Sequence, residues 1–190
     1  CQLLFLPIQE QGKNWKTPVK IPLFEDSSIS VAHPAINRKG TVLVFASDAV
    51  NGKGYRNKDL WVSEYNKRTK EWSEPKNLGR EINTAGDEKF PTIDNAGNLY
   101  FSSNGKIGLG GLDIFKAYKI GTSNKWGKVE NMKYPINSKK DDHGLIYRKN
   151  STNAGFISSN RLNSNELDKK SDIFRFELPT CELTLKGRVR

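Results

Sequence analysis

Cysteine is scarce in this sequence, which has only two, and long apolar runs are missing. The longest apolar segments, Leu3–Leu6 and Val42–Ala46, have the length of a β-strand, far below the roughly 18 residues of a membrane-spanning helix. Helical spacing of apolar residues is absent, and aromatic residues make up 10% of the chain, too many for a disordered protein. These features exclude a disulfide-dense miniprotein, a coiled coil, collagen and a disordered chain. We expect a globular, β-rich chain with no transmembrane segment.

The charge is unbalanced, with 31 lysines and arginines against 21 aspartates and glutamates and a net charge of +10. A surplus of this size favours anionic partners such as nucleic acid, lipid headgroups, acidic glycans or an acidic protein surface. The positive residues are spread along the chain, however, and 22 lysines outnumber 9 arginines, whereas base and phosphate recognition relies on arginine. We therefore expect no nucleic-acid partner and a solvated, lysine-rich surface.

The two cysteines, Cys1 and Cys181, stand at opposite ends of the chain. They form no Cys-x-x-Cys pair and no metal-ligand spacing, and neither lies in a nucleophile motif. Cys1 could carry a lipid, form a disulfide with Cys181 or be an ordinary mid-chain residue, and the sequence leaves these alternatives open.

An internal repeat with a period of about 55 residues organises the chain. Four landmarks recur in one order: a short segment that begins with histidine or phenylalanine, an aromatic strand ending in serine, an Asp-apolar-aromatic triplet and a tryptophan. The segment that begins with histidine or phenylalanine stands at 33–36, 90–93 and 143–146, and the aromatic strand stands at 44–48, 100–104 and 156–160. The triplet begins at Asp59, Asp113 and Asp172, and the tryptophans are Trp15, Trp72 and Trp126. Turn residues such as Asp-Asn-Ala-Gly at 94–97 favour a hairpin between the first two landmarks.

Four short strands in a repeat of this length are typical of one blade of a β-propeller. A single blade cannot bury both faces of its sheet, so neighbouring blades must stack. The residues expected between them are Phe45, Phe101, Ile157, Trp61, Phe115 and Phe174. The sequence thus predicts an all-β fold, a β-propeller of four-stranded antiparallel blades.

We expect the chain to contain the last strands of a preceding blade at 1–25, three blades at 26–80, 81–134 and 135–180, and a further segment at 181–190. About three and a half blades are too few to close a ring. Either the chain is part of a longer protein or a partner supplies the remaining blades. We favour the first alternative and expect a larger ring of five or six blades.

The most regular unit, residues 90–104 followed by 108–115, resembles the WD40-like (PD40, TolB-type) propeller repeat. Segments 72–79 and 82–88 are similar to a Bacteroidetes subset of this repeat, found in OmpA-family outer-membrane-associated proteins that include the peptidoglycan-associated component of the type IX secretion system. Residues 183–189 resemble the first strand of the carboxypeptidase-regulatory-like β-sandwich that follows the propeller in that family. Segment 181–190 is accordingly expected to be the start of such a sandwich or a ring-closing strand.

The resemblance implies a scaffold module in the periplasm, associated with the outer membrane, whose partners are other cell-envelope proteins, with type IX secretion as the expected process. The tetratricopeptide region and the OmpA-like domain of that family have no counterpart in the sequence. Peptidoglycan binding is therefore expected only through domains absent from this chain. The alternative is a glycan-binding or glycan-cleaving propeller, because the units carry paired acidic residues and the chain has four tryptophans.

No convergent catalytic constellation is visible in the sequence. Only His33 and His143 could serve as a base, and both occupy the repeat position of Phe90, which indicates packing. The acidic pairs at 87–88 and 141–142 could act as paired carboxylates, hold a hard cation, or cap the connection by accepting backbone hydrogen bonds. We favour capping, and we expect no enzymatic activity, no cofactor and no metal.

The glycine-rich stretch 105–111 superficially resembles a phosphate-binding loop. It lies between two expected strands with no helix after it, so we interpret it as a flexible inter-strand loop. In a four-stranded meander such loops and the blade-to-blade connections emerge on one side, here 48–58, 104–112, 160–171, 79–89 and 133–142. Loops on a rigid scaffold often carry recognition. The candidate binding residues on this side are Asn104, Asn160, Arg161, Arg56, Lys58, Lys106, Asp87, Glu88 and Asp142.

Overall fold

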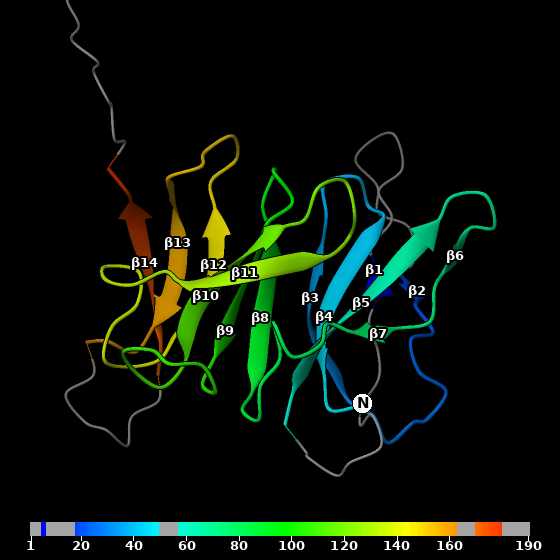
Figure 1. Ribbon diagram of the computed structural model, residues 1–190, viewed down its shortest axis with the longest axis horizontal. Coiled ribbons are helices and arrows are strands. Elements are labelled where there is room, and N and C mark those ends of the chain that lie inside the picture. Colours follow the sequence, from blue (N-terminus) through cyan, green and yellow to red (C-terminus); the bar gives the residue numbers. More distant parts are fainter. Residues whose placement is uncertain (1–4, 7–17, 50–56, 163–169, 180–190) are drawn as a thin grey trace, which may run out of the picture.

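The computed structural model describes residues 5–6, 18–49, 57–162 and 170–179 (Figure 1). Every regular element in these residues is a β-strand, and every strand pair is antiparallel. The predicted all-β fold is therefore confirmed. The described part of the chain contains no helix that could cross a membrane.

The strands form three larger sheets and one two-stranded ladder. The first sheet contains β3 (Val31–Ile36), β4 (Val42–Ser47), β5 (Asp59–Asn66) and β6 (Glu71–Trp72), and β7 (Lys76–Asn77) also pairs with β5. The second sheet contains β8 (Glu88–Ile93), β9 (Leu99–Ser103), β10 (Asp113–Lys119) and β11 (Trp126–Asn131). The third contains β12 (Asp142–Tyr147), β13 (Ala154–Ser159) and β14 (Asp172–Glu177). The ladder pairs β1 (Phe5–Leu6) with β2 (Val19–Lys20).

The same cross-strand pair recurs at the centre of each larger sheet. It joins Phe45 to Trp61, Phe101 to Phe115, and Ile157 to Phe174. Large apolar side chains directly opposite each other stabilise strand pairing, so the repeated landmarks of the sequence fix the same register three times. All six residues belong to the apolar clusters of the structure, as predicted.

In the first and second sheets, the hairpin turns between the first two strands are set by asparagine and aspartate side chains. Asp94 Oδ1 accepts a hydrogen bond from Asn98 N at 2.8 Å, and Gly97 supplies the positive φ of 89° that the turn needs. Asn37 Oδ1 accepts from Thr41 N, also at 2.8 Å. These turns place the second strand of each sheet antiparallel to the first.

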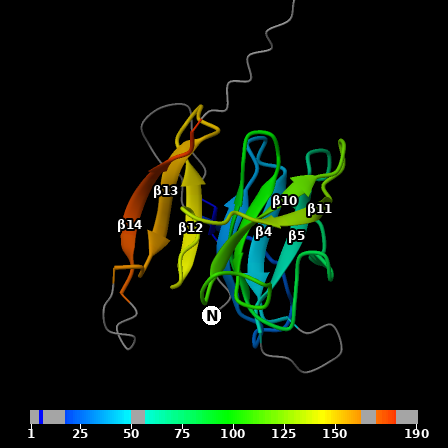
Figure 2. The ribbon, with the colours of Figure 1, turned by 60° about the vertical axis from the view of Figure 1, so that its left-hand side comes forward.

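The three larger sheets stand side by side in chain order (Figures 1 and 2). Between the first and second sheets, the buried core is Val42, Val44, Ala46, Leu60, Val62, Leu99, Phe101, Phe115 and Ala117, with Trp126 at its edge. Between the second and third, it is Tyr100, Ile114, Ile136, Leu145, Ile157 and Phe176. The residues from 18 to 25 contribute Ile21 and Leu23, which cover the opposite face of the first sheet. Burial of these apolar faces is the main force that holds the sheets together.

The first strands of the three sheets lie next to one another, because β8 contacts both β3 and β12. Each contains a bulge, and His33 and Phe90 have positive φ angles of 49° and 51°. The bulges direct a ring from each strand into one column. The ring centroid of Phe90 lies 4.0 Å from that of His33 and 4.5 Å from that of His143. The predicted packing role of the two histidines is confirmed.

The outer face of the third sheet exposes apolar side chains. Ile146, Phe156 and Ile173 are 57%, 40% and 77% exposed. Phe156 and Ile173 occupy the repeat positions of Val44 and Leu60, which are fully buried beneath the second sheet. The third sheet therefore keeps the apolar pattern of a face that packs on a neighbour.

Some predictions concern other parts of the chain. The further segment at 181–190 lies outside the described residues, as do Cys1 and Cys181. Of the strands expected within 1–25, the structure describes the short ladder of β1 and β2.

Candidate functional site

The sheets have two ends, which we name by the segments that form them. The loop end consists of the inter-sheet connections 79–87 and 133–141 and the loop 104–112, and the turn end consists of the hairpin turns 37–41, 94–98 and 148–153. At the loop end, Glu88 N donates to Lys58 O at 2.6 Å and Asp142 N donates to Leu112 O at 2.7 Å. Each connection thus contacts the loop of the preceding sheet, and the predicted common side is confirmed for the described parts of these segments. Residues 50–56 and 163–169 of the predicted loops lie outside the described residues.

Asp87, a candidate binding residue, is engaged in contacts within the loop end. Its Oδ1 accepts from Lys58 N at 2.9 Å, and its own N donates to Asn104 Oδ1 at 2.7 Å. Its carboxylate also pairs with Lys89 at 2.6 Å. Burial alone would raise the pKa of Asp87, but the hydrogen bonds and charges of these lysines hold it below its usual range. Asp87 and Asn104 therefore connect the first and second sheets.

Glu88 is fully buried and points into the protein. Its carboxylate accepts from Thr84 N at 2.8 Å, from Thr84 Oγ1 at 2.7 Å and from Ser103 Oγ at 2.6 Å. Burial raises the pKa of this carboxyl because it penalises the charged form, although the hydrogen bonds partly offset the effect. Glu88 fixes the connection onto β9 and does not reach solvent.

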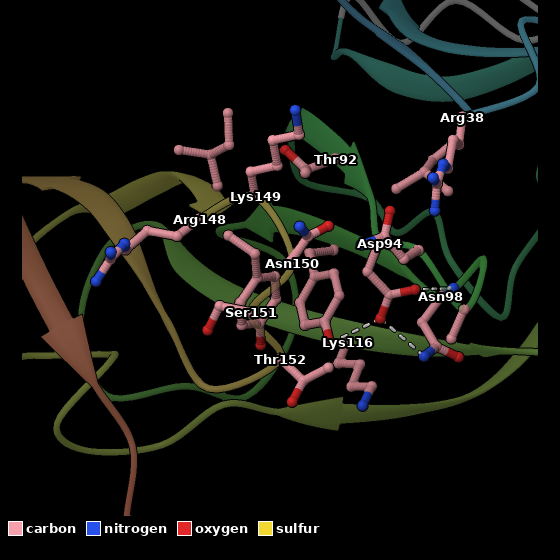
Figure 3. Close-up of a pocket in the computed structure, with 16 residues that line it drawn as sticks. Arg38, Thr92, Asp94, Asn98, Lys116, Arg148, Lys149, Asn150, Ser151 and Thr152 are labelled. Carbon is pink, nitrogen blue, oxygen red and sulfur yellow. Dashed lines mark hydrogen bonds between the residues drawn. The ribbon is translucent and has the colours of Figure 1, made fainter.

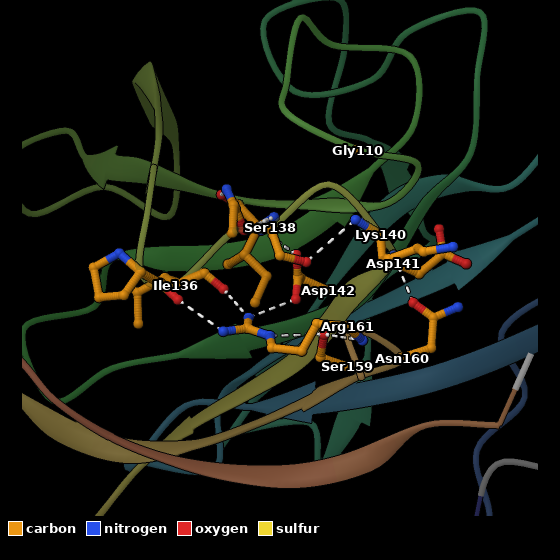
Figure 4. Close-up of polar contacts among 12 residues, drawn as sticks. Gly110, Ile136, Ser138, Lys140, Asp141, Asp142, Ser159, Asn160 and Arg161 are labelled. Atoms are coloured by element: carbon orange, nitrogen blue, oxygen red, sulfur yellow. Dashed lines mark hydrogen bonds and ion pairs between the residues drawn. The ribbon is translucent and has the colours of Figure 1, made fainter. Parts of the chain in front are cut away.

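Asp142 and Arg161 form the corresponding contact in the third sheet (Figure 4). The side chain of Asp142 is 0% exposed and its Oδ1 lies 2.6 Å from Arg161 Nη2. Arg161 also donates to Ile136 O at 2.6 Å and to Pro135 O at 3.0 Å, while Ser138 N donates to Asp142 Oδ2 at 2.5 Å. The planar guanidinium thus holds the connection and the buried carboxylate at once.

Asn160 has the same role in the third sheet as Asn104 has in the second sheet. Its Oδ1 accepts from Asp141 N at 2.8 Å, and Asp141 Oδ1 accepts from Leu112 N at 2.8 Å (Figure 4). The acidic pairs at 87–88 and 141–142 therefore cap the connections, and the capping hypothesis is confirmed. The carboxylates that motivated the glycan alternative are occupied by these bonds.

The remaining candidates are two lysines and one arginine. Lys58 Nζ donates to Ser30 Oγ at 2.7 Å and lies 3.6 Å from Asp48. Lys106 Nζ donates to Glu81 O at 3.0 Å, and burial lowers the pKa of this ammonium. Arg56 lies outside the described residues. The structure thus brings most of the candidates together at the loop end, where their side chains bond to loops, strands and inter-sheet connections of the protein itself.

The glycine-rich loop is closely packed, which corrects the expectation of a flexible loop. It joins β9 to β10, and no helix follows it, as expected. A Cβ on Gly110 would overlap Lys140 O, and one on Gly105 would overlap the side chain of Thr84. The glycines are needed because the loop backbone touches both neighbouring connections.

Two buried asparagines, which the sequence analysis missed, link the sheets further. Asn83 Oδ1 accepts from Leu60 N at 2.8 Å and its Nδ2 donates to Leu60 O at 3.0 Å. Asn137 makes the same two bonds to Ile114, at 2.8 and 2.9 Å. The recurrence of an Ile-Asn pair in both connections was the signal that could have identified them.

A groove of about 410 Å³ opens at the turn end, and it is the candidate functional site (Figure 3). All three sheets contribute: Arg38 comes from the β3–β4 turn, Asp94 and Asn98 from the β8–β9 turn, and Lys149 and Asn150 from the β12–β13 turn. The groove exists only because the sheets are stacked. It lies at the opposite end from the candidate residues of the sequence analysis.

Two tyrosines and a lysine line the groove next to the β8–β9 turn. The rings of Tyr100 and Tyr147 meet edge to face with centroids 5.3 Å apart, and Tyr100 OH donates to Asp94 Oδ2 at 3.3 Å. Burial raises the pKa of Tyr100, with further contributions from Tyr147 and Asp94, so the phenol stays protonated. Lys116 Nζ lies 5.6 Å from the centroid of the Tyr100 ring.

The charged lining of the groove is mostly positive. Arg38, Lys116, Arg148 and Lys149 contribute cations, and Asp94 contributes the carboxylate. None of these cations forms an ion pair with a carboxylate of the described residues. In Figure 3, Arg148 points away from the other labelled side chains. The described residues hold no group of three or more histidines, cysteines or acidic residues that could bind a metal ion.

No protein-family model matches the chain, and no curated protein matches it either. Among solved structures, a luciferin-regenerating enzyme is similar at 14% sequence identity and a TM-score of 0.48. The similar region covers 77% of this chain and 44% of that chain, so the chain spans less than half of the enzyme's length.

This similarity corrects one expectation. The sequence analysis expected a chain that is not an enzyme, whereas the similar solved structure is an enzyme by name. At 14% identity the likeness transfers neither a reaction nor catalytic residues to this chain.

Proposed function

We propose that the chain is part of a β-propeller that serves as a protein-binding scaffold in the periplasm, in a complex associated with the outer membrane. Type IX secretion is the process that the resemblance of its repeats suggests. The repeat supports the proposal, because three sheets built from the same repeat are stacked in chain order. The same asparagine contact recurs in both connections, from Asn83 to Leu60 and from Asn137 to Ile114.

The exposed outer face of the third sheet is evidence for the proposal that the chain is part of a propeller ring. Phe156 and Ile173 are exposed at positions whose counterparts in the first sheet are buried by the next sheet. Exposed apolar side chains in a contiguous patch mark a surface that packs against a partner. We infer that a further sheet of the same kind covers this face in the complete ring.

The observation that carries the binding function is the groove at the turn end. Three sheets contribute to it, and its lining combines cations, amides and hydroxyls on a rigid frame. Convergent polar groups in a preformed hollow are the usual form of a binding site. The loop end is a weaker candidate for binding, since most of its charged side chains are engaged in contacts with the loops and inter-sheet connections.

Site-specific photo-cross-linking in the native cells tests this function. A photoreactive phenylalanine analogue is placed in the full-length protein at Asn95 or Thr152, which are exposed and line the groove. The control position is Leu109, which is exposed at the loop end. We expect the same envelope protein to be captured from both groove positions and not from Leu109.

Two outcomes contradict the proposal: no protein adduct at either groove position, or an equal adduct at Leu109. Fractionation of the same cells tests the location, because a periplasmic scaffold must separate with the envelope and not with the cytosol.

A further inference from the structure

The groove has a surplus of positive charge, although the charge of Lys116 also acts on Glu130, outside the groove lining. Arg38, Lys116 and Lys149 come from three different sheets, and none is ion-paired within the described residues. The carboxylate of Asp94 is already engaged, since it accepts hydrogen bonds from Asn98 N, Asn98 Nδ2 and Tyr100 OH. A ligand that complements this lining must be anionic.

The rim provides groups that suit a peptide. Asn95, Asn150 and Thr152 place amide and hydroxyl groups beside the groove, where they can donate to and accept from a peptide backbone. A volume of about 410 Å³ lies within the range of pockets that enclose a small ligand and accommodates a few side chains.

The lining does not suit nucleic acid. Single-stranded nucleic acid requires exposed aromatic faces on which bases stack and a track of cations along the backbone. Tyr100 is only 3% exposed, and its ring meets Tyr147 edge to face. The cations line one groove and come from three sheets, instead of following a track.

We propose that the groove binds an acidic peptide segment of a partner protein, with its carboxylates placed near Arg38, Lys116 and Lys149. This inference rests on the proposed function and names the chemistry of its partner. The backbone of the segment bonds to the polar rim formed by the β8–β9 and β12–β13 turns.

Fluorescence anisotropy with the full chain tests the assignment. The probe is a labelled eight-residue peptide of alternating glutamate and alanine, and its counterpart carries glutamine in place of each glutamate. The triple variant Arg38→Gln/Lys116→Gln/Lys149→Gln removes the groove cations. The control triple variant Lys39→Gln/Lys67→Gln/Lys125→Gln removes the same charge from exposed turns that do not line the groove.

We expect the glutamate peptide to bind and the glutamine peptide not to bind. The groove variant should weaken binding by roughly tenfold or more, since three charge pairs are lost together, while the control variant should stay within about twofold. An equal loss in the control variant overturns the proposal, because it means attraction to net charge. Absence of binding also overturns it, as does tighter groove-dependent binding of an oligonucleotide of equal charge.

The photo-cross-linking experiment separates this inference from the proposed function. A partner protein captured equally by the wild type and by the groove triple variant leaves the scaffold function standing and overturns the acidic-peptide assignment. Peptide binding that depends on the groove, together with a failure to capture any protein in cells, supports the assignment and contradicts the scaffold function.

Discussion

Replacing Arg161 with glutamine removes the cation that neutralises a buried carboxylate. The Asp142 side chain is 0% exposed and that of Arg161 is 20% exposed, with 2.6 Å between the nearest nitrogen and oxygen. Arg161 also donates to two backbone carbonyls of the connection and, through Nε, to Ser159 Oγ at 3.0 Å. The shorter glutamine cannot make all of these bonds. Among the described residues, the side chain of Asp142 would then keep the hydrogen bond from Ser138 N alone.

The expected loss of stability is large for one substitution. Removing one partner of a buried ion pair costs about 3–5 kcal/mol, and we expect the lower end, about 3 kcal/mol, because Arg161 is partly exposed. The matched control is Arg175→Gln in the same sheet. Arg175 pairs with Glu177 at 3.2 Å, but these side chains are 61% and 63% exposed. Such a surface pair contributes less than about 1 kcal/mol.

Urea unfolding followed by tryptophan fluorescence measures both variants. The double variant Asp142→Asn/Arg161→Gln should recover part of the loss, because no uncompensated buried charge remains. If Arg161→Gln is no more destabilising than Arg175→Gln, then the guanidinium does not hold the connection 133–141 in place and the structural assignment of the loop end is wrong.

Three further predictions concern other contacts of the inter-sheet connections at the loop end. Burial raises the folded-state pKa of Glu88 above its ordinary 4.5, so its contribution to stability is greatest below that pH and falls as pH rises through the raised pKa. Glu88→Gln should therefore flatten the pH dependence of the unfolding free energy; a wild-type-to-variant difference that is independent of pH would contradict this. Asn137→Ala removes two hydrogen bonds to Ile114 and should lower the free energy of unfolding, measured in urea, by about 2–3 kcal/mol. A loss below about 0.5 kcal/mol would contradict this prediction. Gly110→Ala should cost about 1–3 kcal/mol because its methyl group overlaps a backbone oxygen, whereas exposed Leu109→Ala should change the melting temperature little.

The strands could be predicted from the sequence because the same residue pattern occurs in three successive units. The Asp-apolar-aromatic triplets at Asp59, Asp113 and Asp172 open β5, β10 and β14. Alternation along each strand also identified the residues between the sheets, since a strand places successive side chains on opposite faces.

The direction of the charged side chains could not be predicted in the same way. Arg161 and Glu88 stand in or beside loops, where charged residues are usually solvated, and sequence alone gave no measure of burial. Only the stacked sheets bring a connection within reach of each side chain. The equivalent positions of the acidic pairs in successive units were the available sign of a structural role.

The groove depends on how the sheets stack, so it was not predictable from one sequence. Its residues are distant in the chain, from Arg38 to Thr152, and meet only where three turns converge. A partial signal existed, since cations occur in two equivalent turns, as Arg38 and Lys39 in one and as Arg148 and Lys149 in the other.

The most direct test of the account is amide chemical-shift mapping of the isotope-labelled chain as the glutamate peptide is added. The account predicts that the shifted amides cluster in the turns 92–98 and 146–152, with the loop end at 79–89 and 104–112 unchanged. Shifts that cluster at the loop end instead would contradict it, because they would show that the charged residues there recognise a ligand and that the groove does not.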